Sequence, residues 1–174
     1  VLATVLAAPE FLYLTQTVPA RNGRGPQTIS DLELASRLSF FLWSSIPDEQ
    51  LLDLARQGKL GEPAILAAQV TRMLADPRSR RFSENFVRQW LGTDGLESVV
   101  HVTDSSLLEA MQQEPVAFFE DVLHRNSSVL DFIHSDYAVI NERLAGHYHI
   151  AGVHGPHFRQ VPIEPQVNRG GLLT

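Results

Sequence analysis

The sequence contains no cysteine. It therefore cannot form a disulfide, a zinc knuckle, a Cys-ligated iron–sulfur cluster or the Cys-x-x-Cys-His attachment of c-type haem. Long apolar runs are missing as well, since no stretch approaches the roughly 20 residues of a membrane-spanning helix. Basic residues are outnumbered, with 14 Lys and Arg against 20 Asp and Glu and a net charge of −6. This balance argues against a nucleic-acid surface, which needs clustered Lys and Arg.

What the sequence does contain is the material of a helical globular domain. Its 174 residues are 44% hydrophobic and 20% charged, values typical of a folded chain. Apolar residues recur at steps of three and four, and cap residues precede these stretches. We predict an all-α fold, an irregular multi-helix bundle with a loop-rich C-terminal tail and one short strand at 158–163. Helices are predicted to start after the caps Ser30, Asp76, Asp104 and Asn141. Two more are predicted to start at 47–49, where Asp48 and Glu49 suit the helix dipole, and at Pro63. Short helices are also expected at 127–134 and 142–148.

The ends of the sequence predict parts of other domains. Residues 1–14 are interpreted as the end of a preceding helical domain, because Val1–Ala8 is apolar on every side; the apolar part of a secretory signal is the alternative. Residues 15–29 are polar and rich in Gly and Pro, which is typical of a linker. The helical domain is predicted to span 30–165, and 166–174 to begin a following domain.

Several collinear motifs resemble a family of bacterial domains. They are LASRLSFFLWSSIPD at 34–48, KL at 59–60, MLADPR at 73–78, NF at 85–86, QWL at 89–91, SVLD at 128–131, DYAVINERLA at 136–145 and FR at 158–159. Together they resemble DUF1592, a domain of unknown function in large planctomycete-type proteins associated with c-type cytochromes. Two positions depart from that pattern: Pro115 lies within a predicted long helix, and His149 stands where the family usually has Gly.

The resemblance implies a setting rather than a reaction. It implies an exported, periplasmic or extracytoplasmic protein, with haem expected only on neighbouring domains and no cofactor in this segment. Those neighbouring domains, a cytochrome domain among them, are the expected partners. Because the family has no assigned reaction, it supplies no catalytic residue, and whether the chain is an enzyme stays open.

A histidine-rich stretch is the densest chemistry-bearing feature. His147, His149, His154 and His157 lie within eleven residues, and imidazole suits Zn and Cu. Separate, hydrogen-bonded or solvated histidines are the interpretation favoured here, because no carboxylate or thiolate lies between them. Carboxylate–His pairs at 121/124 and 131/134 have the i, i+3 spacing of ligands in di-iron helical bundles. Their side chains are predicted to point away from the core, whereas such ligands must point inward.

Three arginines crowd one predicted helix start. Arg78, Arg80 and Arg81 oppose the helix dipole there. Ion pairs with acids such as Glu84 are the favoured explanation. The alternative is docking of an acidic partner surface, or an anion held jointly by helix amides and the guanidiniums. The aromatic residues, including Trp43, Trp90 and the Phe pairs 40–41 and 118–119, are predicted to lie in the core.

These observations favour a non-catalytic structural or docking module of a larger exported, cytochrome-c-associated and so redox-linked protein. The alternative is part of an enzyme with a His-based metal site around 147–157, in which Asp136 or Glu142 acts as the acid–base group. A third hypothesis is an electron-transfer partner that docks a cytochrome through Arg78–Arg81.

Overall fold

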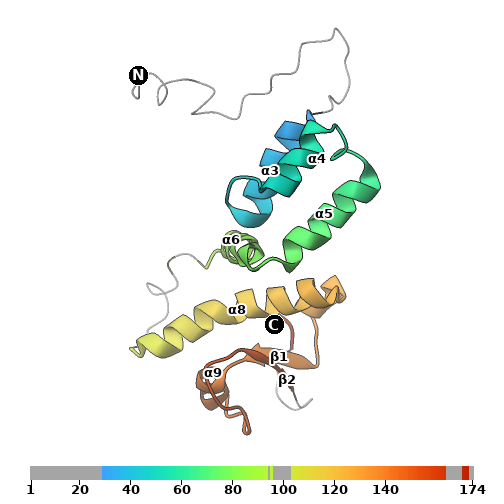
Figure 1. Cartoon of the computed structure of the whole chain (residues 1–174). Helices are drawn as coiled ribbons and strands as arrows, with labels where there is room; N and C mark the ends of the chain where they lie inside the picture. Colours follow the sequence, from blue (N-terminus) through green and yellow to red (C-terminus); the bar gives the residue numbers. More distant parts are fainter. Residues whose placement is uncertain (1–28, 94, 96–102, 164–169, 173–174) are drawn as a thin grey trace, which may run out of the picture. The chain divides into compact units, whose positions relative to one another are not determined.

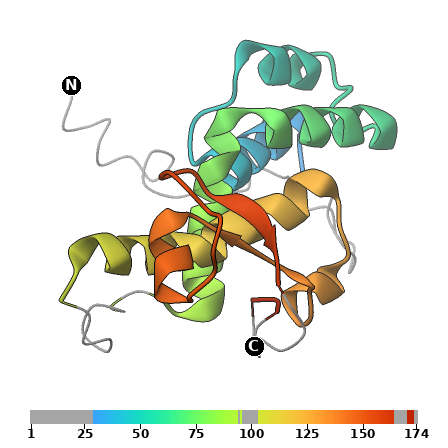
Figure 2. The same ribbon diagram turned by 90° about the horizontal axis from the view of Figure 1, so that it is seen from below.

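The computed structural model describes residues 29–93, 95, 103–163 and 170–172. It divides into two compact units, residues 1–73 and 74–174, drawn in Figures 1 and 2. The predicted end of a preceding domain at 1–14, almost all of the linker at 15–29 and most of 166–174 lie outside the described residues. None of the described helices is long and apolar enough to cross a membrane.

The described part of the first unit contains α3 (Asp31–Trp43), α4 (Glu49–Arg56) and most of α5 (Pro63–Ala75). Ser30 accepts a hydrogen bond from the Glu33 amide, as its cap position predicts. The return half of a capping box does not form among the described contacts, because Glu33 pairs with Arg37 instead, at 2.7 Å. Asp48 caps α4 by accepting from the Leu51 amide. Local signals thus set the helix starts.

A buried tryptophan holds the first unit together. Trp43 is fully buried, and its indole N–H donates to the Met73 carbonyl at 3.0 Å. The guanidinium of Arg72 lies 5.5 Å from the centre of the same ring. Arg72 also makes a two-point ion pair with Asp48, with distances of 2.6 and 3.1 Å. The side chain of Arg72 therefore connects the last turn of α5 to Trp43 at the end of α3 and to Asp48 at the start of α4.

The second unit is built around the long helix α8 (Ser105–Arg125), with α6 (Arg80–Leu91) and α9 (Glu142–His147) packed beside it. Asp104 caps α8, and Asn126 ends it in a left-handed conformation. Pro115 lies inside this unbroken helix. A 3-10 turn, η1 (Pro77–Ser79), precedes α6. Figure 1 shows α8 running along the small sheet.

That sheet has two antiparallel strands, β1 (Tyr137–Ile140) and β2 (Arg159–Pro162), paired with Ile140 opposite Arg159. The strand predicted at 158–163 is confirmed as β2. Its partner β1 was not predicted, although four consecutive apolar residues are typical of a buried strand. The helix expected at 127–134 is reduced to a 3-10 turn, η2 (Val129–Phe132). The fold is otherwise helical, as predicted.

The core of the second unit lies where α8 meets α6, α9 and the sheet. Leu107 and Ala110 pack against Ile140 and Leu144 near the start of α8. Farther along the helix, aromatic rings meet in a continuous array. Its members are Phe82, Phe86, Trp90, Phe118, Phe119, Phe132 and Tyr137, with neighbouring ring centres 5.1–6.2 Å apart.

Candidate functional site

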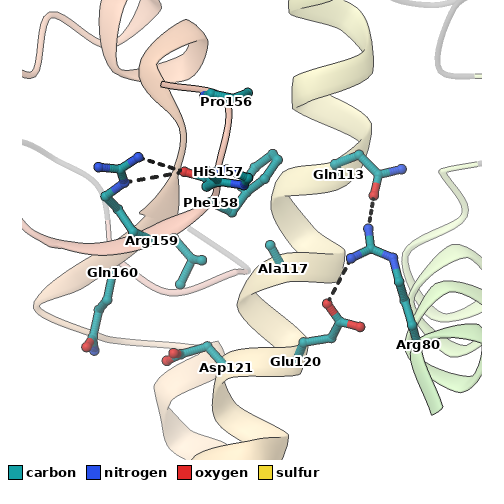
Figure 3. Close-up of a pocket in the computed structure, with 11 residues that line it drawn as sticks. Arg80, Gln113, Ala117, Glu120, Asp121, Pro156, His157, Phe158, Arg159 and Gln160 are labelled. Atoms are coloured by element: carbon teal, nitrogen blue, oxygen red, sulfur yellow. Dashed lines mark hydrogen bonds and ion pairs between the residues drawn. The ribbon is translucent and has the colours of Figure 1, made fainter. Parts of the chain in front are cut away.

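A polar pocket of about 400 Å³ opens between α8 and the segment 156–160. Gln113, Ala117, Glu120 and Asp121 come from α8, at spacings that place them on one face of a helix. In Figure 3, Ala117 lies between the polar side chains, where its small size leaves space. Val139 and Phe158 add apolar surface to the lining.

Arg80 reaches one side of the pocket from α6. Its guanidinium donates to Glu84 at 3.0 Å, to Gln113 at 2.8 Å and to Glu120 at 3.5 Å. Arg159, on the opposite side, donates to the carbonyl of His157 (Figure 3). It also donates to the carbonyl of His154. Both arginines are therefore held in place by several acceptors.

The two carboxylates of the pocket have different surroundings. Burial raises the pKa of Glu120 above its usual 4.5, while the charge of Arg80 acts in the opposite direction. Asp121 pairs with Arg125 at 3.3 Å. Its other oxygen, Oδ2, and the hydroxyl of Tyr137 are both buried, and neither makes a hydrogen bond of good geometry among the described residues. Burial, followed by the charge of Asp121, raises the pKa of Tyr137.

A second feature of this unit is an apolar patch, which we define as Phe86, Trp90, Val129, Leu130 and Ile133. Phe86 and Trp90 are each 42% exposed, and the three residues on or beside η2 are 56–72% exposed. The Trp90 ring meets Phe132 of η2 edge to face, at 5.5 Å between centres. Exposed apolar side chains gathered in this way mark interaction surfaces.

The predicted histidine cluster does not converge in the structure. All four imidazoles lie at exposed positions in or after α9, and the described residues contain no group of three His, Cys, Asp or Glu side chains able to hold a metal. Glu142 accepts from the Gly155 amide at 2.6 Å and lies 3.9 Å from His154. Asp136 is exposed. The metal site stays a prediction.

The predicted arginine cluster is engaged in ion pairs. Arg78 pairs with its own cap residue Asp76 at 2.7 Å, and Arg80 pairs with Glu84 and Glu120. Arg81 is exposed on the first turn of α6. The expectation that nearby acids offset these charges is confirmed for Arg80 and Glu84. Docking of an acidic partner stays a prediction.

A model of the family PSD4, described as protein of unknown function (DUF1592), matches residues 29–150. The chain belongs to the DUF1592 family. No curated protein and no solved structure matches it. The match includes α9 but ends before β2, so the DUF1592 region contributes α8 to the polar pocket while segment 156–160 lies beyond it.

His149 has an unusual backbone conformation, with a φ of +59° in the left-handed region. Gly takes this conformation without steric cost, whereas a residue with a Cβ does not. This is the position at which the sequence resemblance led us to expect Gly.

Sequence reasoning misplaced some aromatic residues of this DUF1592 chain and missed its pocket. Trp43, Phe118 and Phe119 are buried as predicted, but Phe40 and Phe41 are 52% and 62% exposed, and Trp90 is also exposed. These residues do lie in helices, but the spacing of apolar residues along a helix does not show which side of the helix faces the core. The pocket was missed because its walls are distant in sequence. The available signal was one helical face, on which Gln113, Glu120 and Asp121 surround the small Ala117 at steps of three and four residues.

Proposed function

We propose that the chain is a structural docking module of a larger exported, cytochrome-c-associated protein. In this proposal its second unit binds a neighbouring domain of the same polypeptide through the apolar patch. The large exposed apolar side chains of the patch carry the proposal, because monomeric domains seldom leave such residues together in water. Trp90 has the size and position of an interface anchor.

The C-terminal residues of the described chain lie next to the patch. The Leu172 amide donates to the Phe132 carbonyl at 2.8 Å, and the Gly171 amide donates to the Ser135 hydroxyl at 2.8 Å. A Cβ added at Gly170 would lie 2.2 Å from the Ser135 carbonyl oxygen, so this close approach requires Gly. A domain joined to this end would start within reach of the patch. This supports an intramolecular partner.

The cytochrome association and the export are proposed from the family resemblance. The neighbouring domains would carry the haem, since a chain without cysteine has no c-type attachment motif. In this arrangement the present chain positions the redox domains and supplies no cofactor ligand of its own.

Hydrogen–deuterium exchange tests the docking role. We expect residues 86–90 and 129–133 to exchange more slowly in the full-length polypeptide than in the isolated chain. Ile133→Asp should abolish the difference, because it places a charge in the interface. Ala68→Asp, at an exposed position of α5, is the matched control and should leave it intact. Equal exchange in the two polypeptides would refute the docking role.

A further inference from the structure

The polar pocket has the chemistry of a ligand site that the docking role does not use. Its volume of about 400 Å³ lies within the roughly 300–1,000 Å³ of small-molecule pockets. All its walls belong to the second unit, and they come from α6, α8, β1 and the segment 156–160.

The charges of the lining cancel. The lining contains two arginines, Arg80 and Arg159, and two carboxylates, Glu120 and Asp121. Arg80 is already bonded to three acceptors, and Arg159 to two backbone carbonyls. A charged ligand would leave either itself or a lining group without a counter-charge, at a cost in free energy. A neutral ligand fits this balance better.

Hydrogen-bonding capacity remains in the pocket. The amide nitrogen of Gln113 and the whole side-chain amide of Gln160 have no hydrogen-bond partner within the part of the chain that the structure describes. Glu120 uses only Oε2 toward Arg80 in those same residues. Primary amides offer both donors and acceptors, and carboxylates offer acceptors. Hydroxyl groups match such a mixture, because each one donates and accepts.

The pocket also has an apolar side. Ala117, Val139 and Phe158 lie among the polar groups. Phe158 also packs against the buried residues on both sides of β1. A ligand that suits this site carries several hydroxyls and one face of C–H groups. We propose that the pocket binds a neutral pyranose unit, either a free monosaccharide or the terminal residue of a glycan.

Amide chemical shifts of the ¹⁵N-labelled chain, titrated with glucose, galactose and mannose, test the proposal. We expect at least one sugar to give saturable shifts at 113–121 and 157–160, with a Kd of about 1–10 mM. The corresponding methyl glycosides then separate the sources, since only a terminal-residue site accepts a substituent at the anomeric oxygen. Shifts that never saturate up to about 50 mM, or that map elsewhere, would overturn the proposal.

Two charged sugars test whether the pocket prefers a neutral ligand. Glucosamine and glucuronate keep the ring of glucose but add a positive or a negative charge, and each should bind about tenfold more weakly than the neutral sugar. Preference for either charged sugar would overturn the inference of a neutral ligand.

Ala117→Leu fills the pocket and should weaken binding at least about tenfold, whereas Ala68→Leu on an exposed face of α5 should not change it. Should Ala117→Leu fail to fold, Gln113→Ala removes a polar group instead, and unchanged binding there would contradict the assigned site.

Discussion

The hydrogen bond of Trp43 offers the sharpest test of how the first unit is stabilised. Met73 lies in the last turn of α5, where carbonyls lack intrahelical partners. The residue four positions later is Pro77, which has no N–H to donate. The indole of Trp43 supplies the missing donor in a fully buried contact. A sequence-distant side chain therefore completes this helix end.

Trp43→Phe keeps an aromatic ring but removes the donor. A buried acceptor left without its partner costs about 1–3 kcal/mol. The smaller ring also leaves empty volume and weakens the contact with the Arg72 guanidinium, for which Trp is the best aromatic partner. We expect a total loss of about 2–4 kcal/mol in the free energy of unfolding.

Urea denaturation followed by far-UV circular dichroism measures this loss. The sequence has only two tryptophans, so Trp90 fluorescence reports separately on the second unit in the same variant. Trp90→Phe is the matched control. Its side chain is 42% exposed, and we expect a loss below about 1 kcal/mol. Equal losses in the two variants would refute the reasoning that the buried hydrogen bond dominates.

Three further predictions concern single side chains of the second unit. The hydrogen bond from the Ser106 side chain, together with the Leu107 amide and Arg143, lowers the pKa of Asp104 from 3.8 to about 2. The ionised Asp104 carboxylate should therefore contribute fully to the free energy of unfolding above pH 3.8, and this contribution should disappear as the pH falls toward 2. Asp104→Asn should remove this loss of stability in acid. Burial raises the pKa of Glu120, so ionisation of this group should destabilise the folded chain as the pH rises above 4.5. Glu120→Gln should accordingly gain stability relative to the wild type between pH 4 and pH 7. At His149, the left-handed backbone predicts that His149→Gly is more stable than His149→Ala by about 1 kcal/mol.

Denaturant titrations across pH check the first two of these predictions, and a single pair of melts checks the third. An unchanged acid dependence in Asp104→Asn would contradict the assigned role of the cap carboxylate. A Glu120→Gln variant that loses stability on going from pH 4 to pH 7, relative to wild type, would mean that the ion pair with Arg80 outweighs burial. Equal stability of the Gly and Ala variants would show that residue 149 is unstrained.

Much of the local structure follows from short-range sequence signals. Ser30, Asp48, Asp104 and Asn141 each accept hydrogen bonds from the first turn of the helix they precede. Gly92 ends α6 in a left-handed conformation. These interactions join residues three or four positions apart, so both partners lie within about one helical turn of sequence.

These short-range signals did not predict contacts between segments that are distant in sequence. β1 pairs with β2, which follows it only after α9 and a loop, and a four-residue apolar run does not reveal that partner. The stretch at 127–134 looks helical in isolation, yet only Val129–Phe132 coils, as a 3-10 turn. Val129 and Ile133, apolar residues suited to a helix face, are instead largely exposed.

The sequence by itself determined the helical class, the helix starts, the family and the absence of cysteine-based chemistry, because each depends on residue types or on neighbours along the chain. Only the tertiary structure decided which aromatic residues are exposed in the apolar patch, and that all four histidines lie at exposed positions. It also brought Arg80, Glu120 and Gln160 to one pocket. The physical reason is that burial and convergence are properties of packed surfaces, and segments far apart in sequence supply those surfaces.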